Sequence, residues 1–192
     1  MSTPRCHWLP AIALALPGLL LGLLLGVLLA PAGARAEPRN VSPTGFTVEQ
    51  VLTVAAPPAR TWRAITRIQD WWSSEHTWSG DAAHMRLDAQ AGGLWSERWG
   101  DGQSVQHGQV VFCQPGKVLR LDARLGPLQA LPLSAVLTFT TDKAEGGTTL
   151  HLTYRVAGPP DANLERSAAP VDAVLAEQMQ RLKALAESGK VD

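Results

Sequence analysis

The chain has 192 residues with 17 basic and 17 acidic side chains, and 45% of its residues are hydrophobic. This balance suits a globular protein with a core, and no basic run or stripe of the kind that binds nucleic acid is present. Only Cys113 of the two cysteines lies beyond residue 36, so we expect the folded domain to contain no internal disulfide.

Residues 1–36 are expected to be a secretory signal peptide. An uncharged run over 11–30 follows Arg5, and residues 34–36 (Ala-Arg-Ala) give the small-x-small pattern of a signal-peptidase site. We therefore expect export to the periplasm or to the outside of the cell. The run also has the length of about 20 residues that spans a bilayer. An uncleaved membrane anchor through 11–30 is therefore the alternative.

The rest of the chain predicts an α+β domain. Residues 37–45 are rich in turn formers and are expected to be a linker, 46–54 alternates as a strand, and Pro57-Pro58 begins a short amphipathic helix. Six further strands, separated by turns rich in glycine, are expected at 84–89, 94–99, 104–112, 117–125, 133–141 and 148–156. A long helix with one apolar face follows at 163–188.

This order of elements predicts one domain over 46–189. A curved antiparallel sheet of about seven strands would wrap around the long C-terminal helix, because each has an apolar face that the other can bury. A cavity is expected between them.

Tryptophans are the strongest signal for a function. Five of them lie between Trp71 and Trp99, which exceeds what one packing layer usually needs. Burial in the core is the default for each indole, but aromatic lining is also how small-molecule pockets are built. We expect at least two to line a pocket. The stretch 70–85 (DWWSSEHTWSGDAAHM) should fold Trp71, Trp72 and Trp78 over the mouth of a cavity as a lid.

Three polar side chains could share that cavity. Glu97 lies on one strand face with Trp95 and Trp99, His107 on the next strand, and Tyr154 on the apolar face of the last strand. An enclosed carboxylate between two indoles would have a raised pKa, as general acids do. The alternative places Glu97 on the outer surface, paired with an arginine such as Arg120.

The ligand-contacting set also includes Met179 on the last helix. The full set of residues that we expect to contact the ligand is Trp71, Trp72, Trp78, Trp95, Glu97, Trp99, His107, Tyr154 and Met179. Only Glu97, His107 and Tyr154 are candidates for catalysis.

Metal and cofactor sites are not indicated. His76 and His84 are eight residues apart, a spacing that suits no zinc site, so Glu75 and Asp81 beside them are expected to be solvated. No nucleotide-binding glycine motif is present, and Cys113 has no activating neighbour.

Several short motifs together resemble the START-like (SRPBCC) superfamily. They are the pair Trp71-Trp72, the run 91–126 (AGGLWSERWGDGQSVQHGQVVFCQPGKVLRLDARLG), 146–154 (GGTTLHLTY) and 182–185 (LKAL). Within it, the sequence is similar to the branch of heat-shock-protein-90 ATPase activator homologues and polyketide cyclase-like proteins. The resemblance implies a helix-grip fold, a seven-stranded antiparallel sheet around the last helix, over a ligand cavity. Its members bind lipids, sterols or polyketides, catalyse cyclisation, or bind chaperones.

The leading hypothesis is an exported domain that binds a small hydrophobic ligand in an aromatic-lined cavity, as a carrier or sensor without catalysis. One alternative is a cyclase or hydratase with Glu97 or His107 as acid/base and Tyr154 as hydrogen-bond donor. Another is a protein-interaction module of the cell envelope. The sequence indicates no oligomeric state.

Overall fold

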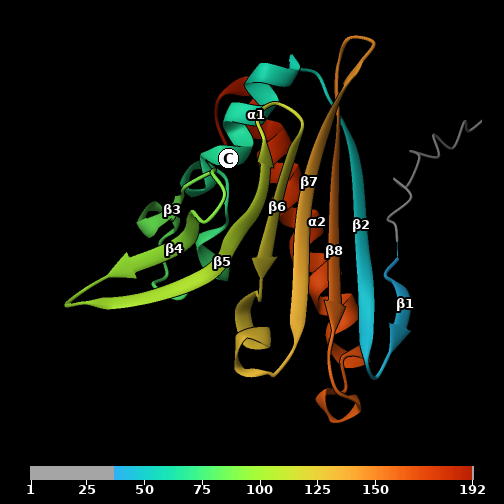
Figure 1. The fold of residues 1–192 in the computed structure, drawn as a ribbon. Coiled ribbons are helices and arrows are strands. Elements are labelled where there is room, and N and C mark those ends of the chain that lie inside the picture. The colour runs from blue at the N-terminus through green and yellow to red at the C-terminus, as the bar shows by residue number, and fades with distance from the viewer. Residues whose placement is uncertain (1–36, 192) are drawn as a thin grey trace, which may run out of the picture. The chain divides into compact units, whose positions relative to one another are not determined.

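The computed structural model describes residues 37–191, so the expected signal peptide or anchor at 1–36 lies outside the described residues. Within that range eight strands form one antiparallel sheet in the order β1-β2-β8-β7-β6-β5-β4-β3 (Figure 1). The strands are β1 (Arg39–Ser42), β2 (Gly45–Val54), β3 (Met85–Leu87), β4 (Leu94–Trp99), β5 (Gln103–Gln114), β6 (Val118–Ala123), β7 (Ser134–Ala144) and β8 (Gly147–Ala157).

Two α-helices accompany the sheet: α1 (Pro58–Thr66), which has proline in its first turn, and α2 (Glu165–Ser188), which ends at Gly189 in the left-handed conformation. The seven strands and two helices expected from the sequence are all found, with ends shifted by a few residues. Between residues 37 and 191, no helix is both long and apolar enough to cross a membrane.

The segment 37–45, expected to be a linker, contains an eighth strand. In β1, Arg39 pairs with Thr47 and Ser42 with Gly45, and the Arg39 guanidinium lies 3.0 Å from the Glu49 carboxylate. The four residues of β1 show no alternation of apolar and polar side chains, and Asn40 has a positive φ. Only pairing with β2 makes this segment a strand, so local pattern could not reveal it.

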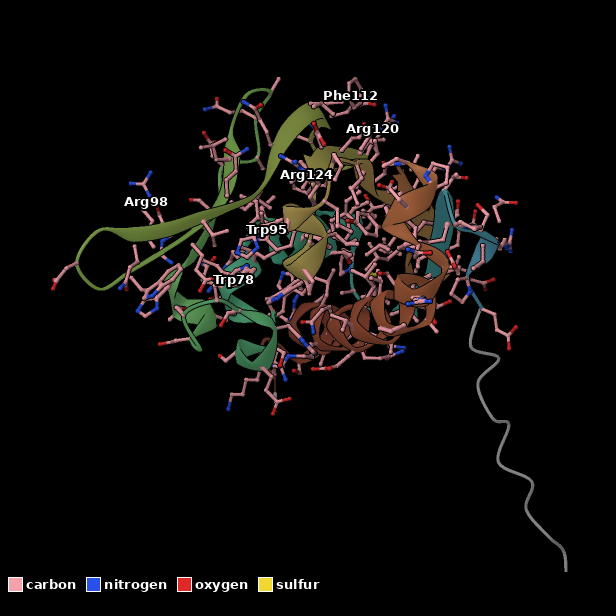
Figure 2. All side chains as sticks on the ribbon, turned by 90° about the horizontal axis from the view of Figure 1, so that it is seen from below. Trp78, Trp95, Arg98, Phe112, Arg120 and Arg124 are labelled. Carbon is pink, nitrogen blue, oxygen red and sulfur yellow. The ribbon has the colours of Figure 1, made fainter. Side chains whose placement is uncertain are left out.

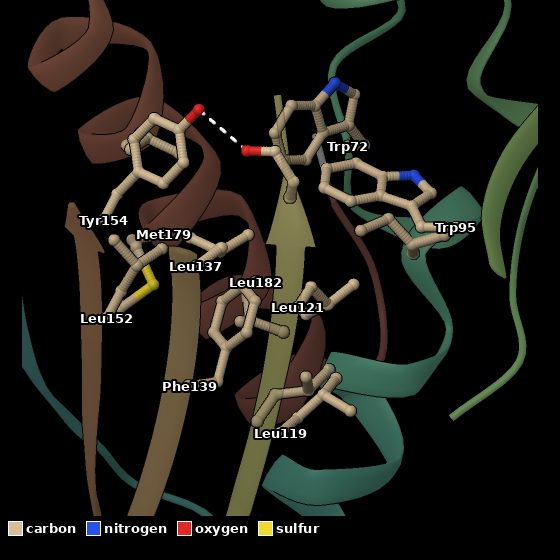
Figure 3. Packing of buried hydrophobic residues seen from close by; sticks show 14 of the residues in the cluster. Trp72, Trp95, Leu119, Leu121, Leu137, Phe139, Leu152, Tyr154, Met179 and Leu182 are labelled. Carbon is tan, nitrogen blue, oxygen red and sulfur yellow. Dashed lines mark hydrogen bonds between the residues drawn. The ribbon is translucent and has the colours of Figure 1, made fainter. Parts of the chain in front are cut away.

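The core lies between the concave face of the sheet and α2. Alternate residues of β7 and β8 point inward and meet the apolar face of α2, as Figure 3 shows. The side chains that meet there include Leu137, Phe139, Leu152, Met179 and Leu182. They fill the centre of the fold, so the open volume described below lies at one end of α2.

A bulge in β5 sets the direction of His107. Trp95 pairs with Gly108 and Ser96 with Gln106, which leaves His107 as the extra residue opposite β4. His107 and Gly108 are consequently both buried, while Gln109 is exposed. Simple alternation would have put Gln109 on the same face as His107.

The tryptophan-rich segment (residues 70–85) follows α1 and packs on α2. It consists of short 3-10 turns rather than one element. The Arg181 guanidinium Nε donates to the Trp71 carbonyl over 2.8 Å, and the Ser73 N–H donates to the Gln178 side-chain oxygen over 2.7 Å. The start of this segment is therefore fixed to α2.

Candidate functional site

A pocket of about 430 Å³ opens between the tryptophan-rich segment, the 3-10 helix Gly126–Ala130 and the N-terminal half of α2. Glu75, His76 and Arg166 bring polar groups to it. Most of the lining is apolar, with Trp72, Trp78, Leu125, Leu128, Val171 and Leu175 among the residues that form it. Both the size and the lining are typical of small-molecule sites.

Two of the expected tryptophans line this pocket, in different ways. Trp72 is buried, and its indole Nε1 donates to the His76 carbonyl over 2.9 Å, which fixes the ring in the wall. Trp78 has 55% of its surface exposed beside the pocket. An exposed indole next to an apolar pocket extends its apolar surface, and contiguous exposed apolar surface commonly marks a binding site.

Three of the expected ligand contacts pack in the core instead. Trp71 lies edge-on to Phe139 with ring centroids 6.3 Å apart, and Met179 is buried on α2. Trp95 packs edge-on against Trp72, with ring centroids 4.9 Å apart (Figure 3). These side chains occupy the space where the sequence led us to expect a central cavity.

Trp99 is also separate from the pocket. It is half-buried near the end of β4, where it borders a different, shallow hollow with Arg98 and Gln103. The alternation that placed Trp95, Glu97 and Trp99 on one face holds, but β4 runs away from α2, so its last residue does not reach the pocket (Figure 1).

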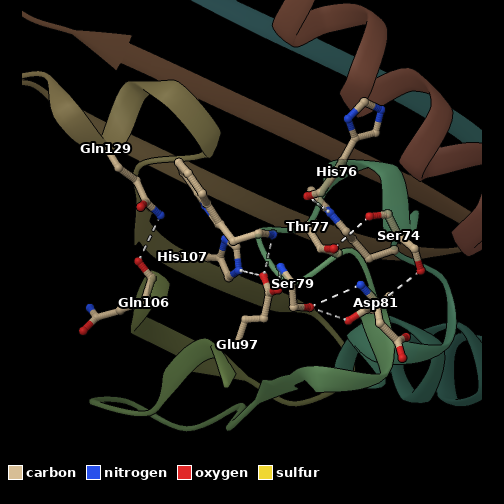
Figure 4. A network of polar contacts seen from close by, with 12 residues as sticks. Ser74, His76, Thr77, Ser79, Asp81, Glu97, Gln106, His107 and Gln129 are labelled. Atoms are coloured by element: carbon tan, nitrogen blue, oxygen red, sulfur yellow. Dashed lines mark hydrogen bonds and ion pairs between the residues drawn. The ribbon is translucent and has the colours of Figure 1, made fainter. Parts of the chain in front are cut away.

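Glu97 is completely buried, and its carboxylate accepts three hydrogen bonds (Figure 4). The backbone N–H groups of Trp78 and Ser79 donate to it over 3.1 and 2.5 Å, and His107 Nε2 lies 3.0 Å away. The carboxylate therefore binds the backbone of the tryptophan-rich segment at the point where Trp78 enters the pocket wall.

The pKa of Glu97 is lowered, opposite to our expectation. Burial by itself raises this pKa, but the hydrogen bonds from Ser79, Trp78 and His107 outweigh burial and favour the ionised form. Burial lowers the pKa of His107, and Glu97 opposes that shift only in part. An ionised Glu97 can only accept hydrogen bonds, so a neutral His107 carries its proton on Nε2.

Glu97 does not pair with Arg120 on the outside of the sheet. The Arg120 guanidinium lies 5.6 Å from the ring centre of Phe112, and both side chains are on the outer surface (Figure 2). The inward position of Glu97 is the one expected for a shared cavity, although the carboxylate does not border the pocket.

Tyr154 is not joined to Glu97 and His107. Its hydroxyl donates to the Ala123 carbonyl over 2.9 Å and accepts from the Leu125 N–H over 3.3 Å. Burial raises the pKa of this phenol. Because Leu125 borders the pocket, Tyr154 fixes the backbone at the start of the wall that Leu125 and the following 3-10 helix form.

The histidines and acids of the tryptophan-rich segment do not form a metal site. His76 Nε2 lies 3.2 Å from Glu177 on α2, and Asp81 caps the turn Ala82–His84 through the Ala83 N–H. Across the described residues 37–191, no three His, Cys, Asp or Glu side chains lie close enough together to hold a metal ion.

Comparison with known proteins gives one family. The sequence model of the family described as polyketide cyclase / dehydrase and lipid transport matches residues 45–187. No curated protein matches the chain.

Several solved structures have the same fold. Protein CV1439 from Chromobacterium violaceum is 20% identical, with 73% of this chain and 96% of that chain covered and a TM-score of 0.52. The di-domain ARO/CYC StfQ from the steffimycin biosynthetic pathway is 16% identical, with 75% and 51% covered and a TM-score of 0.52. DynU16 from the dynemicin biosynthetic locus is 19% identical, with 76% and 48% covered and a TM-score of 0.54. These likenesses confirm the helix-grip fold.

Proposed function

The chain belongs to the polyketide cyclase / dehydrase and lipid transport family, and we propose that its domain binds a small hydrophobic ligand in the pocket between Trp72, Trp78 and α2. The observation that carries the proposal is the 55% exposed indole of Trp78 beside an apolar pocket of about 430 Å³. The domain then acts as a carrier or sensor, and its function requires no chemical step.

A ligand would gain free energy mainly by removing these apolar surfaces from water. Burial of apolar area contributes about 25 cal/mol per Å², and more than half of the Trp78 surface is exposed beside the pocket. Trp72 faces the same pocket with its ring held by the bond to His76. Two indoles and the aliphatic side chains of Val171 and Leu175 favour a flat aromatic or an acyl ligand.

Cyclase or hydratase chemistry has less support from this geometry. Neither Glu97 nor His107 borders the pocket, and the three hydrogen bonds to Glu97 favour its ionised form. A general acid must hold a proton within reach of the substrate. The Tyr154 hydroxyl is likewise occupied by two backbone groups.

Titration with an uncharged aromatic fluorophore, N-phenyl-1-naphthylamine, tests the proposal. We expect saturable enhancement of its emission, and at least tenfold weaker binding in Trp78→Ala. The matched control is Trp99→Ala, which removes a half-buried indole outside the pocket. The proposal fails if no member of an aromatic and acyl ligand panel binds, or if both variants bind as the wild type does.

We also propose that the domain works outside the cytoplasm. Support comes from the sequence of residues 1–36, where an uncharged run is followed by Ala-Arg-Ala. Fractionation of the producing cells and N-terminal sequencing test this. A chain that begins at Glu37 in an exported fraction is expected, and an intact N-terminus in the cytoplasmic fraction would contradict it.

A further inference from the structure

We infer that Glu97 and His107 are positioning residues for the ligand: they hold Trp78 in the wall of the pocket without touching the ligand. The inference rests on the proposed function of this pocket. It gives a role to a buried polar pair that neither borders the pocket nor is accounted for by packing alone.

Glu97 holds the position of the Trp78 side chain through hydrogen bonds to the backbone on either side of its Cα. Glu97 accepts from the N–H of Trp78 over 3.1 Å and from the N–H of Ser79 over 2.5 Å. Two consecutive amides bound to one carboxylate fix the direction in which the intervening side chain leaves the backbone. For Trp78, whose indole is largely exposed, this anchor sets where the ring stands.

Other anchors of the tryptophan-rich segment act at its beginning. Arg181 binds the Trp71 carbonyl and Gln178 binds the Ser73 N–H, both from α2. His76 and Glu177 meet at 3.2 Å near the surface, where an ion pair contributes little. After Thr77 the segment is next fixed at Ala82 and Met85, which are buried in the core. Between Thr77 and Ala82 the buried group that binds the backbone is the Glu97 carboxylate, so its loss would free Trp78 while Trp72 stays in place.

His107 makes the anchor possible. The β5 bulge turns its ring toward Glu97, and Nε2 supplies the third donor at 3.0 Å. The Trp95 indole packs against the His107 ring, with centroids 5.0 Å apart. A carboxylate buried at 0% exposure is tolerated only when donors surround it, and His107 completes that set.

The substitution Glu97→Gln tests the inference, with N-phenyl-1-naphthylamine as the probe. The amide group keeps the size of the side chain but turns one acceptor into a donor that faces backbone N–H groups. We expect about tenfold weaker probe binding, since one hydrogen bond to a charged group is lost. Glu145→Gln, in the exposed turn between β7 and β8, is the charge-matched control and should bind as the wild type does.

Amide hydrogen exchange, followed by NMR, separates positioning from general stability. In Glu97→Gln the Trp78 and Ser79 amides should lose protection, while amides in the centre of β7 and β8 keep theirs. A urea titration checks that the variant is folded. If it is not, Glu97→Asp takes its place, because it keeps the charge, shortens the side chain and should show the same losses in smaller degree.

The outcomes distinguish this inference from the function on which it rests. Wild-type affinity together with protected Trp78 and Ser79 amides in the folded Glu97 variant would overturn the positioning role and leave the ligand site intact. Absence of any probe binding that depends on Trp78 in the wild type would overturn both.

Discussion

The Nε2–H of His107 donates to Oε2 of Glu97 over 3.0 Å, and both side chains are buried directly behind the wall that Trp78 forms. A histidine and an acid at this distance are the usual components of acid/base catalysis. Here the same carboxylate also accepts two backbone N–H groups, which favours its ionised form. The pair is therefore better suited to hold a loop than to transfer a proton.

Glu97 and His107 should make the free energy of unfolding decrease as the pH falls, because the pKa of each is lowered in the folded state. The pKa of His107 lies below its ordinary value of 6.5. As the pH falls below that value, the unfolded chain binds the proton first and the free energy of unfolding decreases. The pKa of Glu97 lies below 4.5, so its contribution is present above pH 4.5 and is lost as the pH falls through the folded-state pKa. Urea titrations between pH 8 and pH 5 measure the His107 loss, and titrations extended from pH 4.5 to pH 2 measure the Glu97 loss.

The control is His107→Gln, which keeps a side-chain N–H donor but does not titrate. Its free energy of unfolding should change less than that of the wild type between pH 6.5 and pH 5. Equal slopes for the two proteins in this interval would show that His107 is not the group responsible.

Loss of the Tyr154 hydroxyl should destabilise the domain without any change in its core packing. In Tyr154→Phe the Ala123 carbonyl and the Leu125 N–H lose their partner while the ring stays against Phe46. A buried polar group left unpaired costs about 1–3 kcal/mol. Urea unfolding at pH 7 checks this. A variant as stable as the wild type would mean that water replaces the hydroxyl.

The two kinds of tryptophan should respond differently to truncation. Trp71→Ala removes an indole that is 1% exposed and should cost about 3–5 kcal/mol of stability. Trp78→Ala removes a largely exposed ring and should change the free energy of unfolding by no more than about 0.5 kcal/mol. Thermal unfolding of both variants measures the contrast. A large loss of stability in Trp78→Ala would mean that its ring serves the fold and not a ligand.

Much of the fold could be predicted from the sequence because its elements have clear local patterns. Alternation of apolar and polar residues predicted β7 and β8, the proline pair predicted the start of α1, and helical spacing of apolar residues predicted α2. The resemblance to polyketide cyclase-like proteins of the START-like superfamily is confirmed by the family match over 45–187. The relation to ATPase activator homologues stays a prediction.

The candidate site was less predictable because its residues depend on contacts between distant segments. The sequence placed Trp71, Trp72 and Trp78 over a cavity mouth; Trp72 and Trp78 line the pocket, and contact of either with a ligand stays a prediction. It could not show that Trp71 and Trp95 fill the interior, since a core indole and a pocket indole have the same local pattern. Nor could it show that backbone N–H groups of a loop 18 residues away lower the pKa of Glu97. The pocket residues of α2 and Leu125 carried no sequence signal beyond being apolar.

Alanine should destabilise the fold for different reasons at the two glycines before β4, Gly92 and Gly93. At Gly93 an added Cβ would lie 2.1 Å from the Asp88 carbonyl oxygen, a backbone atom that cannot move aside. At Gly92 a Cβ would meet open space, but φ is +85°, which other residues rarely adopt.

We therefore expect Gly93→Ala to cost about 3 kcal/mol, as severe overpacking does, and Gly92→Ala about 1 kcal/mol from backbone strain alone. Urea unfolding of the two variants gives the order directly. The Gly93 N–H donates to the Gln90 carbonyl and its own carbonyl accepts from Val110, so the clash would also disturb the edge of the sheet beside Trp95. A Gly93→Ala variant no less stable than Gly92→Ala would mean that this turn relaxes away from β5, and that the close approach to Asp88 is not what requires glycine there.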